Sequence, residues 1–154
     1  MAVEVTVPYE RSFTVNRPLA EAFTHLSDVE SSIPKHFYGI SEFKRLEDTS
    51  YHWIFQKLEY SSYSFQLSLK TRFEFKPSEH ILMHAIPSKD DPCLLKGSWV
   101  FKDQGTGTQI VFVAEFKVSL PVPFLLKSMV TSLTQKEITK LLDRYVQHLI
   151  KTLA

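Results

Sequence analysis

Residues 124–153 contain neither glycine nor proline, and they follow the turn-forming residues LPVP. Such a stretch predicts one long carboxyl-terminal helix of about eight turns at ~3.6 residues per turn. The apolar side chains that share one face of its second half are Ile138, Leu141, Leu142, Tyr145 and Leu149. A helix with one apolar stripe must bury it against another element, so the remaining sequence must supply an apolar surface.

The sequence before this helix alternates between apolar and polar residues in one segment after another. This period of two predicts half-buried strands over residues 3–15, 40–46, 51–60, 63–75, 80–86, 94–101 and 108–120. The intervening residues 102–108, KDQGTGT, hold two of the four glycines and predict a hairpin turn. Short connections between consecutive strands indicate an antiparallel meander in an α+β fold.

Residues 16–39 lose the alternation and show helical spacing. Asn16 is a candidate amino-terminal cap, and Pro18 suits a first helical turn. The apolar residues at helical spacing are Leu19, Phe23 and Leu26. The next residues, VESSIPKHFYG, predict a second short helix that is interrupted by Pro34 and ends near Gly39.

Charge and composition restrict the class of protein. The formal net charge is +1 and the pI is about 7.9, whereas a nucleic-acid-binding domain commonly has a pI above about 9. A single cysteine gives no disulfide framework. The sequence shows no signal-peptide pattern and no run near the ~18 apolar residues of a membrane span. We therefore expect a cytoplasmic, soluble protein that binds no nucleic acid.

Three longer stretches resemble one superfamily. ERSFTVNRPLAEAFTHLSDVESSIP resembles the opening of START-like, birch-pollen-allergen-like proteins, which include polyketide cyclase and coenzyme Q-binding types. GSWVFKDQGTGTQIVFVAEFKV resembles their closing hairpin, and LPVPFLLKSMV the entry to their last helix. The resemblance spans residues 1–154 and implies one helix-grip domain. In this fold a curved antiparallel sheet of about seven strands wraps around the long carboxyl-terminal helix, and two short helices follow the first strand.

The same resemblance implies an apolar cavity between sheet and helix but no shared catalytic motif. We therefore favour binding or transport of a hydrophobic small molecule, such as a lipid, an isoprenoid quinone or a polyketide-like aromatic, without metal or cofactor. The inward phase of the strands and the first half of the long helix supply the candidate cavity-lining residues: Arg11, Phe13, Trp53, Phe55, Tyr63, Phe65, Leu67, Trp99, Phe101, Phe112, Phe116, Met129 and Leu133.

Arg11 is the exception in this set, because it occupies an apolar phase of VPYERSFTV. Three placements are open for it. It pairs with an inward-facing acid, for which Glu59 is the candidate. Alternatively, its stem lies on apolar surface with its head in water, or its guanidinium anchors an anionic or carbonyl-bearing ligand.

Two other functions remain as alternatives. A cyclase- or hydrolase-type enzyme would draw on Arg11, Tyr63, Glu59 and His84, but no acid–base pair is evident and we favour a non-enzymatic role. The other alternative is a protein-interaction module with a filled core.

The remaining polar motifs predict little chemistry. His80 and His84 are four residues apart in a predicted strand, about 13 Å, which is too far for one metal ion. Cys93 has no histidine or asparagine near it in sequence and is expected to be inert. The pair Asp90–Asp91 is expected to be a solvated turn.

The long helix carries two further features. In its first half, Leu126, Met129, Val130 and Leu133 lie on the side that is basic further along. Hence either the helix bends near 131–135 and buries this half in the core, or this half lines or gates a cavity mouth, or it makes an oligomer contact. The basic stripe, Lys136, Lys140, Arg144 and Lys151, is either a solvated face or a peripheral contact with acidic lipid or an acidic partner.

Overall fold

The computed structural model describes residues 3–60 and 62–154. Within these ranges the strands are β1 (Val3–Val15), β2 (Ile40–Glu47), β3 (Ser50–Phe55), β4 (Leu58–Tyr60), β5 (Tyr63–Phe65), β6 (Ser68–Lys76), β7 (His80–Ile86), β8 (Cys93–Asp103) and β9 (Thr108–Leu120). The helices are α1 (Leu19–Ser27), α2 (Val29–His36), the 3-10 turn η1 (Phe124–Leu126) and α3 (Lys127–Thr152).

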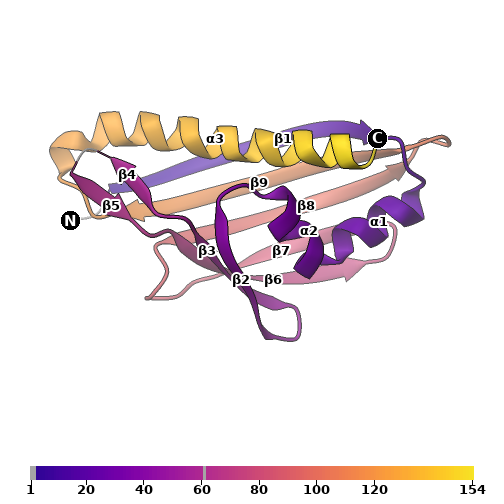
Figure 1. Ribbon diagram of the computed structural model, residues 1–154, viewed down its shortest axis with the longest axis horizontal. Helices are drawn as coiled ribbons and strands as arrows, with labels where there is room; N and C mark the ends of the chain where they lie inside the picture. Colours follow the sequence, from indigo (N-terminus) through magenta and orange to yellow (C-terminus); the bar gives the residue numbers. More distant parts are fainter. Residues whose placement is uncertain (1–2, 61) are drawn as a thin grey trace.

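The strands form one open antiparallel sheet of seven, in the order β1-β9-β8-β7-β6-β3-β2, and β4 pairs with β5 in a separate hairpin. Figure 1 shows α3 running along one face of this sheet, with α1 and α2 near its later half and β4 and β5 near its start. The predicted helix-grip fold is confirmed, including the two short helices after the first strand and the long last helix.

The local sequence explains the longest strand pair. In β1 and β9 every second side chain is buried over most of the length, which matches the alternation in the sequence. Gly105, with φ +84°, forms the β8–β9 turn in a region that costs other residues steric strain. A Cβ atom at Gly97 would collide with the carbonyl oxygen of Val113, so this position in the β8–β9 pair requires glycine.

Two strand predictions are wrong in their extent. Residues 51–60 and 63–75 do not form continuous strands, because the chain leaves the sheet after Phe55 and rejoins it at Ser68. The backbone N–H of Phe55 donates to the Leu67 carbonyl (2.9 Å), and the Gln66 side-chain amide donates to the Phe55 carbonyl. These hydrogen bonds join the two ends of the segment that leaves the sheet. The β4–β5 hairpin lies between those ends, outside the seven-stranded sheet.

The predicted cap of α1 is also wrong. Pro18 occupies the cap position, and no side chain caps the helix. The backbone N–H of Asn16 instead donates to the carbonyl of Leu153 (3.1 Å). This bond ties the end of β1 to the end of α3. The predicted interruption of α2 at Pro34 is wrong, because the helix continues through Pro34 and ends at His36.

None of the helices within residues 3–60 and 62–154 is long and apolar enough to cross a membrane.

Candidate ligand-binding site

An apolar cleft opens between the first half of α3, the end of β9 and the β4–β5 hairpin. Its volume is about 410 Å3, within the range of small-molecule sites. The apolar residues that line it are Leu58, Phe65, Leu67, Val118, Leu120, Val130, Leu133 and Ile138. Glu59, Thr134 and Glu137 supply polar groups at the same cleft. We call it the end cleft.

The end cleft lies where the β4–β5 hairpin leaves the sheet. Val118 and Leu120 continue the inward phase of β9 and form the floor. Val130 and Leu133 of α3 form the opposite wall, and Leu58 and Phe65 bring the hairpin over the side. The walls therefore come from three elements distant in sequence.

A second hollow of about 190 Å3 adjoins the end cleft and shares Leu58, Leu67, Glu137 and Ile138 with it. Phe55 and Phe116 are its buried aromatic residues. The lining of this hollow also includes three cationic side chains, those of Lys57, Lys140 and Arg144. A ligand that extended from the end cleft into it would pass from an apolar environment to a cationic one.

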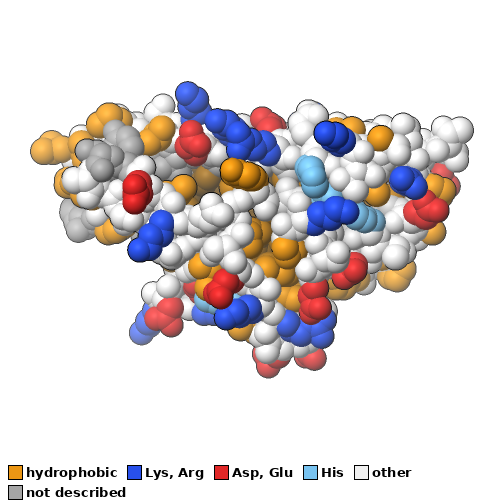
Figure 2. Space-filling model, in the orientation of Figure 1, with side chains coloured by type: hydrophobic (Ala, Val, Ile, Leu, Met, Phe, Trp, Pro, Cys, Tyr) orange, Lys and Arg blue, Asp and Glu red, His pale blue; other side chains and the backbone are white. Residues whose placement is uncertain are grey.

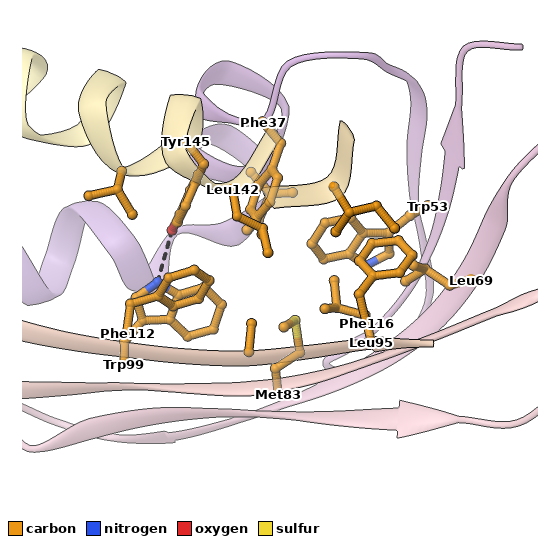
Figure 3. Packing of buried hydrophobic residues seen from close by; sticks show 14 of the residues in the cluster. Phe37, Trp53, Leu69, Met83, Leu95, Trp99, Phe112, Phe116, Leu142 and Tyr145 are labelled. Carbon is orange, nitrogen blue, oxygen red and sulfur yellow. Dashed lines mark hydrogen bonds between the residues drawn. The ribbon is translucent and has the colours of Figure 1, made fainter. Parts of the chain in front are cut away.

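The middle of the grip is filled by side chains. Figure 3 shows Phe37, Trp99, Phe112 and Tyr145 meeting between the sheet and α3. The ring centroids of Phe37 and Tyr145 are 4.0 Å apart, and those of Trp99 and Phe112 are 5.1 Å apart. The Trp99 indole N–H donates to the Tyr145 hydroxyl (2.9 Å), which satisfies two polar groups in the core. Burial raises the pKa of Tyr145, so the hydroxyl stays protonated.

The structure thus divides the predicted cavity-lining residues into two sets. Those at the end cleft or its adjoining hollow are Phe55, Phe65, Leu67, Phe116 and Leu133. Those packed in the core away from these openings are Phe13, Trp53, Trp99, Phe101 and Phe112. Tyr63 lies on the hairpin, half-buried, and Met129 is exposed on α3.

Arg11 faces α3, and its guanidinium lies 3.7 Å from the Asp143 carboxylate. The paired acid is therefore on the helix and is not Glu59. Tyr9 donates its hydroxyl to the same carboxylate (2.6 Å), and burial together with this hydrogen bond raises the pKa of Tyr9 to about 12. Arg11 is absent from the end-cleft lining. Its ion pair links β1 to α3 at a position that is partly exposed to solvent.

The groups considered for enzymatic chemistry are dispersed. Glu59 and Tyr63 are on the hairpin, and Arg11 is on β1. His84 pairs with Glu74 (3.1 Å) across β7 and β6, in the strand phase opposite to the buried Met83. No acid–base pair assembles from these four residues.

Three histidines from the three helices form an unpredicted chain. His36 contacts His25 through Nε2 (2.8 Å) and His148 through Nδ1 (2.6 Å). In the neutral chain each contact joins one N–H to one lone pair. Burial, together with the neighbouring His25, His148 and Lys35, lowers the pKa of His36 to about 3. The spacing of His25 and His36 on successive helices was a signal for this contact, but His148 was not foreseeable.

The three imidazoles of this histidine cluster do not point at one common position for a metal ion, because His36 directs Nε2 to His25 and Nδ1 to His148. Within the described ranges, no group of three or more His, Cys, Asp or Glu side chains is arranged to hold a metal ion.

The expectation of a solvated turn at Asp90–Asp91 is wrong for Asp91, whose side chain is 2% exposed. Its Oδ1 accepts hydrogen bonds from Ser68 (2.6 Å) and His52 (2.9 Å), and Oδ2 lies 2.9 Å from the Lys70 ammonium. Burial alone would raise the pKa of Asp91, but the bonds from Ser68, Lys70 and His52 lower it to about 2. Asp91 thus fastens the β7–β8 loop to β3 and β6.

Cys93 is buried, and burial raises its pKa to about 12, which disfavours the reactive thiolate.

Comparison with known proteins supports the fold. No family model and no curated protein matches the sequence. Among solved structures, the ZhuI aromatase/cyclase from a Streptomyces species matches with a TM-score of 0.71 at 13% identity, over 96% of this chain and 93% of that one. A START superfamily protein from Mycobacterium smegmatis matches with a TM-score of 0.64 at 14% identity, over 96% and 99%. The chain therefore has a START-like helix-grip fold.

Proposed function

We propose that the protein binds or transports one hydrophobic small molecule, held non-covalently in the end cleft. The observation that carries this proposal is an apolar opening of about 410 Å3 in a grip whose middle is filled. The fold is shared with an aromatase/cyclase and a START superfamily protein, which supports a ligand-binding use of this fold. A lipid tail, an isoprenoid quinone or a polyketide-like aromatic fits the lining chemistry.

Apolar burial supplies the affinity in this proposal, and the polar groups at the edge orient the ligand. Of the residues predicted from sequence, Phe65, Leu67 and Leu133 contact the ligand body, and Phe55 and Phe116 contact any part that reaches the adjoining hollow. Arg11, Tyr63 and His84 lie outside the lining of the end cleft, so the residues considered for catalysis do not converge there, and binding is the activity that we propose.

The test is titration with cis-parinaric acid, a fluorescent polyene whose emission rises in apolar surroundings. We expect saturable binding that Leu133→Trp weakens by about tenfold, ~1.4 kcal/mol, because the indole fills the cleft. Val100→Trp is the matched control, since Val100 is exposed on the sheet. Native mass spectrometry of the purified protein should detect a co-purifying apolar molecule. Absence of saturable binding, or equal loss in both variants, would contradict the proposal.

A further inference from the structure

The outward face of the long helix changes from apolar to basic along its length. In the 3-10 turn η1, which leads into α3, Leu125 is 95% exposed and Phe124 63%, and Met129 in the first turn of α3 is 52% exposed. Large apolar side chains in such exposure, gathered within two turns, mark an interaction site more often than an unused surface. Figure 2 shows hydrophobic side chains at the end of the molecule where α3 begins, and Lys and Arg side chains over its middle.

The basic residues continue the face on which Met129 lies. At ~100° per residue, positions 136, 140 and 151 fall within about 40° of position 129 around the helix axis. Lys127, next to the apolar end, places its ammonium 5.2 Å from the Phe124 ring centroid. The apolar end and the basic stripe are thus parts of one surface, which we call the α3 outer face.

Charge is concentrated on this face. A groove beside it, lined by α2 and α3, carries Lys35, Lys136, Lys140, Arg144 and Lys151. The one carboxylate in that lining, Asp143, is engaged by Tyr9 and Arg11. The groove therefore has a formal charge of +4 while the whole chain has +1, so the rest of the protein carries −3.

This combination identifies the chemistry of the partner. A second copy of the chain fits poorly, because parallel helices would oppose basic stripes and antiparallel helices would place each apolar end on a basic stripe. An anionic bilayer surface accommodates both parts, since its headgroups attract lysine and arginine while its acyl boundary accepts apolar side chains.

We propose that the α3 outer face docks on anionic phospholipid membranes, with Phe124, Leu125 and Met129 inserted below the headgroups and the basic stripe lying on them. The end cleft opens beside this apolar end, because Val130 and Leu133 of the same helix form its wall. The docking does not depend on whether the cleft holds a ligand.

The test is co-sedimentation of the full chain with sucrose-loaded vesicles. We expect binding to phosphatidylcholine–phosphatidylserine vesicles that weakens with added salt, and little binding to pure phosphatidylcholine. Lys136→Glu with Lys140→Glu should lower the partition coefficient by at least about tenfold. Lys96→Glu with Lys102→Glu on β8 changes the net charge equally and should retain binding much closer to that of the parent.

The apolar contribution is tested separately with Leu125→Glu and Met129→Glu together. Both side chains are exposed, so the variant should keep the parent circular dichroism spectrum and melting temperature while losing vesicle binding. Val113→Glu, at an exposed apolar residue of β9, is the control. Three results would overturn the proposal: no vesicle binding, whether or not soluble inositol hexakisphosphate binds; equal binding to neutral vesicles; or a concentration-dependent dimer that the Leu125/Met129 variant abolishes.

Discussion

The two halves of α3 rest on the same sheet but differ in how the space beneath them is used. Under the later half, Tyr145, Phe37, Trp99 and Phe112 pack as a continuous aromatic core. Under the first half, the sheet and helix are separated by the end cleft. The comparison shows that one helix-grip fold can have a densely packed core under one half of its long helix and an open cleft under the other half. Packing density depends on which side chains meet at each place.

The largest expected effect tests the filled half. Trp99→Ala should lower the free energy of unfolding by about 3–5 kcal/mol, because it leaves a large cavity and orphans the Tyr145 hydroxyl. Leu133→Ala, at the wall of the cleft, should cost less than about 1 kcal/mol. Urea denaturation of both variants measures the contrast. Equal losses would show that the two halves are equally packed.

The next effect concerns the β7–β8 loop, which contacts β9 near the end cleft. Asp91→Ala should lower the free energy of unfolding by about 2–3 kcal/mol, because it leaves the partly buried Lys70 ammonium without its counter-charge. The loop that Asp91 fastens also bonds β9 near the cleft floor, through Ser119 N–H to the Pro92 carbonyl (2.9 Å). Thus amide hydrogen exchange should increase at Ser119. Asp90→Ala, next to it in an exposed position, is the control and should have little effect.

A third effect depends on pH and acts on the filled half, where His36 joins α1, α2 and α3. The folded pKa of His36, about 3, lies below the unfolded value of 6.5. Its contribution to stability is therefore complete above pH 6.5 and decreases as pH falls toward 3, because the unfolded chain binds the proton first. We expect a loss of about 1–2 kcal/mol between pH 7 and pH 5.

Thermal melts across that pH range check this expectation. His36→Phe should flatten the dependence, because phenylalanine binds no proton. An unaltered acid limb in His36→Phe would show that another group is responsible.

The smallest effect concerns the contact of Arg11 and Tyr9 on β1 with Asp143 on α3. Asp143→Asn should cost about 0.5–1 kcal/mol, because the Arg11 pair is partly solvated. It should also remove the carboxylate contribution that raises the Tyr9 pKa. Spectrophotometric titration of the tyrosines and chemical denaturation measure the two effects. A loss above about 2 kcal/mol would show that this contact holds the helix on the sheet to a greater degree than its exposure indicates.

Much of the fold was predictable because the period of the sequence reports burial directly. Val3–Val15 alternates in the sequence and in the structure, and the stripe of Ile138, Leu142, Tyr145 and Leu149 is buried as expected. In β3 the inward phase is that of Trp53 and Phe55, as expected. The break between β3 and β4 had a signal in the sequence, because the apolar phase shifts between Phe55 and Leu58 and shifts back between Tyr60 and Tyr63.

The site was less predictable than the fold. Phe112 and Phe116 have the same strand phase in the sequence, yet one is packed in the aromatic core and the other lies at the hollow beside the cleft. Phase specifies the face of a sheet, but not whether another side chain already fills the space above that face.

The sequence by itself determined which residues face the helix, since side-chain direction follows from the local backbone period. It placed Arg11 on that inward face. Only the tertiary structure decided that Asp143 is the partner of Arg11, that Asp91 is buried, and that side chains fill the space under the later half of α3 but leave a cleft under its first half. These outcomes depend on contacts between residues more than a hundred positions apart or on opposite sides of a loop, which a local pattern does not encode.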